Sequence, residues 1–294
     1  MSINFLIEEM VDRENVPRIC ESIRKVGHRF ETCKYIPFES GTYNQFKDDE
    51  CVVFFGSLGL ARQLMRTKPW VPGPFCNLNN FKCSAYYAYW YKYLWNDQHI
   101  FLPYAVFKSQ INQIVDYFGY SADAWSLFIR PDDGFKTFTG QVIDSQSYNS
   151  DIKYLDSKCK PETLCVIAPC KTPLAEWRVF CKDRTIICGS QYRVAGKIDT
   201  EEIEGIPVKC EAYLQSVLNE VQWIPERLYV VDIAAGISKP EFKLGKQWKF
   251  EDFEYGVLEL NSFSCSGMYK CDVNKIVAAA ATVAKEEFDE INNQ

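Results

Sequence analysis

The chain has 294 residues, of which 47% are apolar, so it is long enough for one large domain or two modest ones with a sizeable core. Its formal net charge of −6 argues against the broad basic surface that binding to nucleic-acid backbones requires. No nucleic-acid partner is therefore expected.

The N-terminal sequence predicts neither export nor membrane insertion. MSINFLIEEMVDRE places acidic side chains where a signal peptide needs a basic and then an apolar segment, and no later run approaches ~18 apolar residues. The 13 cysteines occur singly, which is typical of reduced thiols. A cytoplasmic protein with no membrane partner is expected.

Histidine is scarce, and this limits the chemistry that the chain can perform. His28 and His99 are the only two, and no C-x-x-C pair is present, so a structural zinc site is not expected. A Ser-His-Asp or Cys-His arrangement would have to recruit one of these two histidines. Catalysis is therefore expected to rest on carboxylates, lysine and arginine.

The first third of the chain predicts an α/β lobe. Residues 51–55 predict an apolar strand, followed by a glycine turn and a helix from about Ser57. The glycines lack the full dinucleotide fingerprint and the P-loop lysine, so they indicate helix packing. The aromatic segment SAYYAYWYKYLW predicts a buried element between domains rather than a base-stacking platform, with a subunit interface as an open alternative. A helix is expected over 105–118, and we place a domain boundary at residue 103.

Residues 104–294 are richer in strands and predict a domain built mainly on antiparallel pairs. The polar turn of Lys182, Asp183 and Arg184 joins two apolar runs and predicts a hairpin. Helices are expected at 208–221 and at 273–291, where Asp272 supplies an N-cap. Strands are expected in WSLFIR, GQVI, LCVIA, LAEWRVFC, TIICGSQYR, LYVVDIAA and YGVLELNSF.

Three side chains with oxygen ligands suggest a metal site. Glu259 and Asn261 lie two apart in VLELNSF, so on a strand both leave the same face. Asp232 interrupts an apolar strand, where an ionised carboxylate needs a cation or strong donors. Such oxygens suit Mg²⁺, which also coordinates phosphates, so a magnesium nucleotide is the inferred ligand. Each residue also has a structural reading: a turn cap for Asp232, an ion-pair partner for Glu259, and an ordered bend after Asn261.

Basic residues upstream offer contacts for an anion. Arg130 and Lys136 lie in the glycine-containing loop FIRPDDGFKTFTG, and two cations there suit a polyphosphate. Glu176 and Arg178 share one strand face in EWRVF, and Arg193 ends the strand expected to pair with it. A surface salt bridge is the alternative reading for these last three residues.

Taken in chain order, these features resemble an ATP-grasp domain over about residues 125–270. The matching pieces are RPDDGFK, EWRVFCKDRTIICGSQYR, YVVDIAAG and GVLELNSFSCSGMY. They are similar to a divergent bacterial and phage clade related to the eukaryotic cell-division-cycle factor that helps assemble a translation initiation complex, and to glutamate ligases that modify ribosomal proteins. The implied fold class is α+β: two α+β lobes sandwich ATP (104–294), preceded by a smaller α/β N-terminal lobe (1–103).

The resemblance also implies roles for individual residues. Asp232, Glu259 and Asn261 would be metal ligands. Lys136, Arg178 and Arg193 would be the catalytic residues that neutralise the transferred phosphoryl group. ATP would be held from both lobes, with the strand Cys165–Ala168 along the adenine, by Arg130, Lys136, Val166, Ile167, Ala168, Glu176 and Arg178.

The activity that the resemblance implies depends on ATP and Mg²⁺. A carboxylate attacks the γ-phosphate, and an amine displaces the phosphate of the resulting acylphosphate to form an amide. Both substrates are unknown, and a peptide or protein is one form they could take. A non-catalytic ATP-binding assembly factor and a phosphotransferase are the alternatives. Two departures from the family are the turn SCSGMY and the insert KPEFKLGKQWKFEDF, which is expected to shape the substrate opening.

Overall fold

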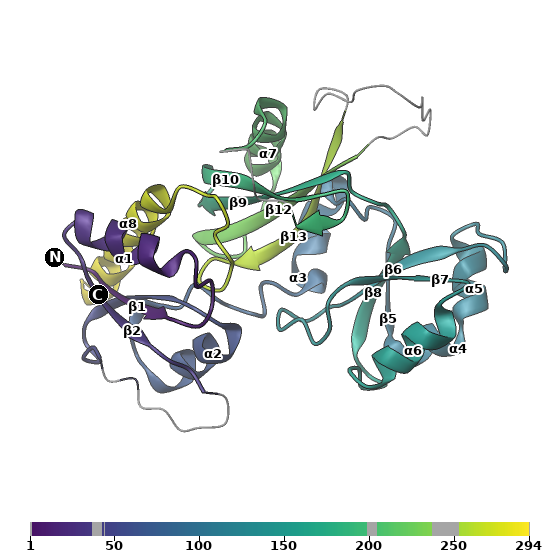
Figure 1. Cartoon of the computed structure of the whole chain (residues 1–294), viewed down its shortest axis with the longest axis horizontal. Coiled ribbons are helices and arrows are strands. Elements are labelled where there is room, and N and C mark those ends of the chain that lie inside the picture. Colours follow the sequence, from purple (N-terminus) through teal and green to yellow (C-terminus); the bar gives the residue numbers. More distant parts are fainter. Residues whose placement is uncertain (1, 37–42, 44, 199–204, 237–252, 294) are drawn as a thin grey trace.

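A computed structural model describes residues 2–36, 43, 45–198, 205–236 and 253–293. Three β-sheets follow one another along the long axis of the molecule, and both ends of the chain lie in the same outer lobe (Figure 1). The insert between Asp232 and Glu259 falls almost wholly within residues 237–252, outside the described residues. No helix in the described ranges combines the length and apolar character needed to cross a membrane.

The first lobe is a parallel sheet with strand order β2-β1-β3-β4. The predicted strand at 51–55 and the helix after Ser57 are confirmed, and the Ser57 hydroxyl caps that helix by accepting from Leu60 N at 3.2 Å. The elements are β1 (Asn4–Glu8), α1 (Val16–Lys25), β2 (Arg29–Cys33), β3 (Cys51–Phe55), α2 (Leu58–Thr67) and β4 (Val71–Gly73).

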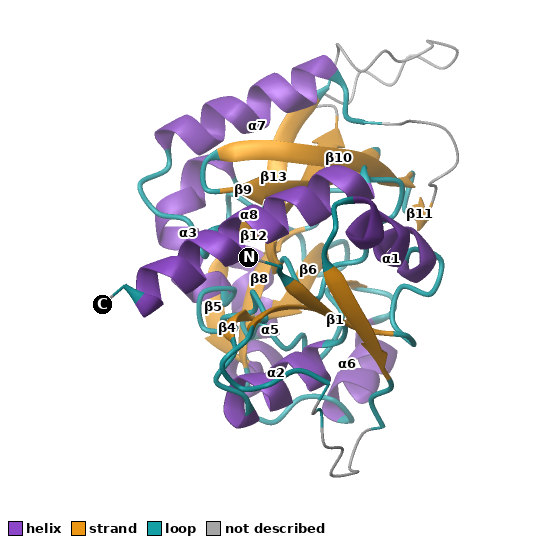
Figure 2. Cartoon of the chain, turned by 90° about the vertical axis from the view of Figure 1, so that its left-hand side faces the viewer, coloured by secondary structure: helices purple, strands orange, loops and turns teal. Residues whose placement is uncertain are grey.

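The last helix, α8 (Val273–Asn292), returns to this first lobe. Its apolar stripe, which includes Ile276 and Ala280, packs in one core with Phe5 and Ile23, and Figure 2 shows α8 beside α1. Asp272 caps the helix, as predicted, by accepting from Asn274 N and Lys275 N. The first lobe is thus built from both ends of the chain.

The second lobe is an antiparallel sheet with strand order β5-β8-β6-β7, covered by three helices. The helix expected over 105–118 is two short helices that meet at Gln110. Strand β5 precedes the predicted boundary at residue 103, and yet it pairs with β8. The elements are β5 (Ile100–Pro103), α4 (Tyr104–Ser109), α5 (Ile111–Tyr117), β6 (Ser126–Pro131), β7 (Gln141–Asp144), α6 (Tyr148–Asp156) and β8 (Leu164–Pro169).

The central sheet is antiparallel, with order β11-β10-β9-β12-β13. The predicted hairpin is confirmed, and Asp183 has the positive φ of its turn (49°). The elements are β9 (Ala175–Lys182), β10 (Thr185–Val194), β11 (Lys197–Ile198), α7 (Val208–Glu220), β12 (Leu228–Gly236) and β13 (Glu254–Ser262).

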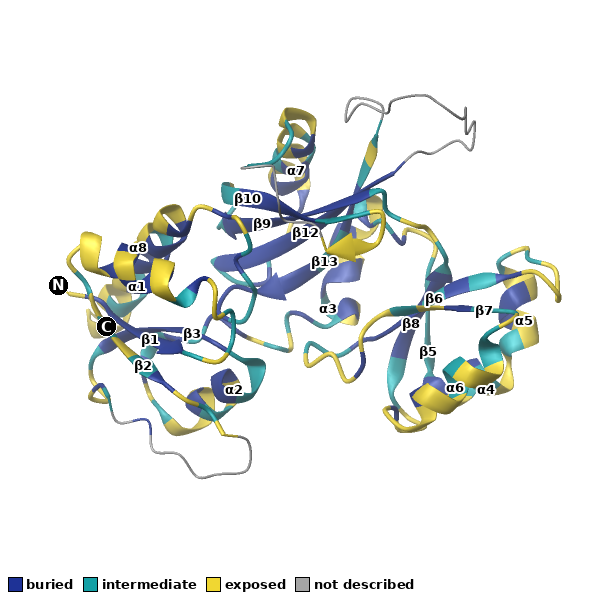
Figure 3. Ribbon diagram, viewed as in Figure 1, coloured by how far each residue is buried: buried dark blue, intermediate teal, exposed yellow. Residues whose placement is uncertain are grey.

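The two faces of the central sheet differ because side chains alternate along each strand. One face packs Trp177 and Val231 against α7 and against α3 (Cys83–Trp90), the aromatic helix that precedes the short η1 (Tyr91–Tyr93). Tyr86 and Trp90 of α3 are buried there, as predicted, and Figure 3 shows the strands as the most buried part of the molecule. The other face carries the polar residues of the site.

Two chain segments join the second lobe to the central sheet, and they lie side by side. Trp95, on the first segment, donates from Nε1 to Lys171 O (3.2 Å), and Lys171 Nζ donates to Trp95 O (3.0 Å). Trp95 N also donates to Val257 O at 2.8 Å, and its ring packs on Gly236 and Gly256. Both connections therefore pass through one point.

Candidate functional site in the cavity between two sheets

A row of charged residues crosses three neighbouring strands of the central sheet. Asp232 on β12 is the register partner of Arg178 on β9 and of Glu259 on β13. Asn261 lies two residues beyond Glu259, on the same face. The alternation that predicted a shared face for Glu259 and Asn261 therefore also brings Arg178 and Asp232 to them.

Arg178 and Asp232 form a buried, bidentate ion pair. Arg178 Nε donates to Asp232 Oδ1 at 2.9 Å and Nη2 donates to Oδ2 at 2.7 Å, while the Asp232 side chain is only 1% exposed. Burial raises the pKa of Asp232, and the Arg178 guanidinium opposes that shift. The rings of Tyr192 and Tyr269 lie against the same guanidinium. The pair is thus held rigidly from several sides.

Glu259 links the central sheet to the second lobe. Arg130 Nη2, from β6, lies 2.8 Å from Glu259 Oε2, and Lys136 Nζ, from the loop after β6, lies 2.9 Å from Oε1. Burial alone would raise the pKa of Glu259, but Lys136 and Arg130 outweigh it and hold the pKa well below its usual range. Lys136 has a positive φ of 54°, a strained conformation that is common at functional sites.

Glu176 and Arg193 lie at the side of this row. Tyr192 Oη donates to Glu176 Oε2 at 2.5 Å, and Arg193 Nη1 lies 3.6 Å from Glu176 Oε1. Burial raises the pKa of Glu176, and the bond from Tyr192 opposes this. Arg193 is 41% exposed, so it is the more mobile and more weakly paired of the two arginines on this face.

A cavity of about 440 Å³ separates the central sheet from the second lobe. It receives the polar row on one side and apolar side chains from the second lobe on the other, which sequence reasoning missed. These are Phe128 and Phe138, joined by Trp95 and the linker 170–173. The proline-flanked linker PCKTP was the available signal for the linker part of this lining.

The three predicted adenine contacts, Val166, Ile167 and Ala168, are not among the residues that line this cavity. They are fully buried within β8, between β5 and β6. The strand that leads into the linker is thus part of the core of the second lobe, and the linker 170–173 is the segment next to the cavity. The apolar run LCVIA therefore marks a structural strand whose continuation reaches the site.

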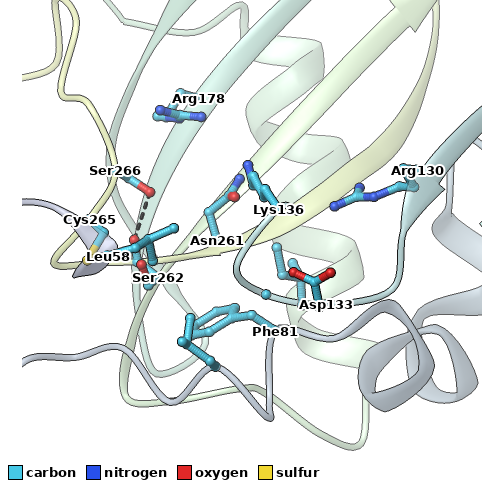
Figure 4. Close-up of a pocket in the computed structure, with 13 residues that line it drawn as sticks. Leu58, Phe81, Arg130, Asp133, Lys136, Arg178, Asn261, Ser262, Cys265 and Ser266 are labelled. Atoms are coloured by element: carbon cyan, nitrogen blue, oxygen red, sulfur yellow. Dashed lines mark hydrogen bonds between the residues drawn. The ribbon is translucent and has the colours of Figure 1, made fainter. Parts of the chain in front are cut away.

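A second cavity of about 140 Å³ adjoins the first, and both are lined by Arg130, Lys136 and Arg178. Figure 4 shows Arg178, Lys136 and Arg130 along one side of it and Phe81 on the opposite side. The first lobe contributes Leu58, and the loop after β13 contributes Ser262, Cys265 and Ser266. The basic residues therefore lie between two spaces, one on each side.

The donor set of Asp232, Glu259 and Asn261 fits a magnesium ion. Asn261 Nδ2 donates to Asp232 Oδ2 and to Glu259 Oε1, both at 3.0 Å, so the two carboxylates face one point. Rotation of the amide would turn its oxygen toward the same point. Two carboxylates and an amide leave positions for phosphate oxygens, as Mg²⁺ prefers. No group of three or more His, Cys, Asp or Glu side chains forms a metal cluster elsewhere in the described residues.

The electrostatic balance of the site favours an anion. Arg130, Lys136 and Arg178 surround two carboxylates, Asp232 and Glu259, so the cluster carries a net positive charge although the whole chain is acidic. A buried positive charge beside a cavity attracts polyphosphates strongly because little water screens it.

Solved structures with the same fold are ATP-grasp enzymes. They include the D-cycloserine synthetase DcsG (12% identity, covering 96% of this chain and 100% of that one, TM-score 0.64) and D-alanyl-alanine synthetase A from Vibrio cholerae O1 biovar eltor (12%, 98% and 98%, 0.59). A third is the ATP-grasp ligase PsnB in complex with a minimal precursor, Mg and ADP (14%, 96% and 97%, 0.51). At such identities the likeness concerns the fold.

No curated protein sequence matches this chain significantly. The expected relation to the eukaryotic cell-division-cycle factor and to the ribosomal-protein glutamate ligases stays a prediction. The predicted α+β fold, with a smaller α/β lobe before it, is confirmed by the three sheets and by the solved structures. A family model of an ATP-grasp domain, the second family of its clade, matches residues 101–279, more than half of the chain, and the protein belongs to this ATP-grasp family.

Proposed function

We propose that this protein is an ATP- and Mg²⁺-dependent ligase that forms an amide bond between a carboxylic acid and an amine. The observation that carries the proposal is the polar cluster between the two cavities, in which Arg130 and Lys136 of one lobe meet Glu259 of the central sheet. The nucleotide is placed in the larger cavity and the carboxylic acid in the smaller one, with the cluster at the phosphates between them.

The adenine of the proposed ATP occupies the apolar part of the larger cavity. Phe128 and Phe138 line it from the second lobe, Trp95 lines it at the junction of the lobes, and the linker 170–173 supplies backbone groups of the kind that recognise a base edge. Val166, Ile167 and Ala168 support this position from within β8. Glu176 lies on the floor of the same cavity, where it is fixed by Tyr192.

In the proposed reaction, a carboxylate oxygen of the acid attacks the γ-phosphorus and ADP leaves. An amine nitrogen then attacks the acyl carbon, the C–O bond to phosphate breaks, and the amine loses a proton. Lys136 and Arg178 line both cavities and neutralise the charge that develops on the transferred phosphoryl group. Arg193 would add a third positive charge from its more exposed position.

Asp232, Glu259 and Asn261 would hold the magnesium ion. When bound, Mg²⁺ supplies Lewis-acid stabilisation of the phosphate oxygens. The ion pairs of Glu259 with Arg130 and Lys136 keep that carboxylate ionised, so it is ready to meet a cation. The phosphates would then accept hydrogen bonds from the same two basic residues.

The decisive experiment measures magnesium-dependent ATP binding by calorimetry, followed by ADP release and intact-mass analysis with amino acids, peptides and lysate. Glu259→Gln and Asp232→Asn are expected to lower ADP release by about 100-fold or more while the fold is kept. Glu254→Gln, at the far end of the same strand, is the matched control and should behave as wild type. Wild-type turnover in both site variants would refute the metal assignment.

The outcomes also separate the three possible activities. ADP release with a new amide mass supports the ligase. A stable phosphorylated product without an amide would indicate a phosphotransferase, and ATP binding without turnover would indicate an assembly factor. Absence of ATP binding would refute the nucleotide site itself.

A further inference from the structure

Glu8 is a buried carboxylate outside the polar cluster. It is the last residue of β1, and its residue surface is only 4% exposed. Its Oε2 accepts from Ser57 N at 2.7 Å, at the start of α2. Both β1 and β3 end here, and ligands of parallel sheets bind at the carboxyl ends of the strands. Glu8 therefore lies where this lobe is expected to meet a small molecule.

The second oxygen of this carboxylate has no partner among the described residues. Neither a basic side chain nor a further N–H meets Glu8 Oε1 there. Asp12, on the same side of the lobe, is different, because Asn15 Nδ2 and Met268 N both donate to it at 2.9 Å. A buried carboxylate oxygen without a donor is costly, so Glu8 is the group that a ligand with a positive charge would stabilise.

A small cavity of about 20 Å³ opens beside Glu8, which gives room for one group of the size of water or ammonium. It adjoins the 140 Å³ cavity, since both are lined by Cys265 and Ser266 and by opposite ends of the turn 56–58. Together they form one groove between the first lobe and the loop after β13. The groove has a carboxylate at one end and the basic residues Lys136 and Arg178 at the other.

We propose that this groove binds a free amino acid with a small apolar side chain. Its ammonium group lies at Glu8, its carboxylate points to Arg178 and Lys136, and its side chain contacts the apolar wall of Leu58, Leu78, Phe81 and Leu260. That this carboxylate is the group activated by ATP rests on the proposed function.

The charges at the two ends would also decide which end of the amino acid reacts. A carboxylate near Arg178 and Lys136 lies beside the proposed phosphates, whereas an ammonium group that donates to Glu8 keeps its proton. A protonated amine has no lone pair for attack on an acyl carbon. The bound amino acid is therefore the acid substrate, and a different molecule supplies the amine.

The first test uses hydroxylamine as a general acceptor, because it converts an acylphosphate into a hydroxamate. The full-length protein is given ATP, Mg²⁺ and one acid from a matched pair: alanine or propionate, leucine or isocaproate. We expect kcat/KM for the acids without an amine to be lower by about 10- to 100-fold, the range of a lost charge-assisted hydrogen bond. Equal use of both members of each pair would overturn the proposal.

The second test changes Glu8 itself. Glu8→Gln keeps an oxygen for Ser57 N–H and removes the charge, so KM for the amino acid should rise by about 10- to 100-fold while KM for ATP stays constant. The control is Glu9→Gln at the next position, where the carboxylate accepts from Thr32 Oγ1, and both constants should be unchanged. A Glu8→Gln protein that uses amino acids as the wild type does would show that Glu8 only caps α2.

Calorimetry separates this site from the proposed reaction. Alanine and leucine are titrated into wild type and Glu8→Gln, each saturated with Mg²⁺ and a nonhydrolysable ATP analogue. Binding by the wild type and a loss in Glu8→Gln, without any hydroxamate, would support the amino-acid site and refute the ligase. Absence of binding by the wild type would overturn the site, even if other acids gave hydroxamates.

Discussion

Removal of Arg178 should destabilise the fold strongly, because Asp232 would lose its counter-ion. Arg178→Met has a similar length and no charge, and it leaves a carboxylate that is 1% exposed with one remaining donor, Asn261. Breaking a buried ion pair from one side costs about 3–5 kcal/mol. The free energy of unfolding in urea is expected to fall by that amount, with circular dichroism as the readout.

The double variant Arg178→Met/Asp232→Asn separates this explanation from a loss of packing. Because the buried charge is gone, the double variant should be more stable than Arg178→Met alone. Burial raises the pKa of Asp232, so in Arg178→Met its contribution is present at low pH and lost as pH rises through that pKa. Arg178→Met should therefore recover stability relative to the wild type as pH falls. A cost below about 1 kcal/mol, or an additive double variant, would refute the argument.

Three further changes test other parts of the fold. Burial raises the pKa of Glu226 to about 8, from 4.5, so stability is full below pH 4.5 and falls as pH rises through 8; Glu226→Gln should remove this dependence in urea unfolding between pH 5 and 9. Gly256→Ala should cost roughly 1–3 kcal/mol, since its Cβ would lie 2.9 Å from Trp95 Cα, and an unchanged melting temperature would contradict that clash. Asp272→Ala removes the cap of α8 and should cost about 1 kcal/mol, with Asn292→Ala at the other end as a near-neutral control.

The polar face of the central sheet could be predicted because it depends on local alternation. Glu259 and Asn261 are two residues apart on one strand, so their shared face follows from the sequence. The pairing of Arg178 with Asp232 could not be predicted, because the register of two strands 54 residues apart depends on the whole sheet. A bulge after Asp232 shifts that register further.

The lining of the cavities was harder to predict than the polar cluster. Phe128 and Phe138 look like core residues in the sequence, and only the packing of two sheets turns them toward a cavity. The linker 170–173 was missed because the apolar strand before it has the stronger signal. The open oxygen of Glu8 depends on what the fold leaves unpaired, and no sequence pattern reports that.

The paired bonds between Trp95 and Lys171 make the second lobe an insertion with a single pivot. A rotation there needs changes in only a few backbone dihedrals, as in other hinged domains. The same rotation would separate Arg130 and Lys136 from Glu259, because the bases and the acid lie on opposite sides of the pivot. Phosphates that compete with Glu259 for these two bases would thus weaken the latch that holds the lobes together, so nucleotide entry and lobe movement share one set of charges.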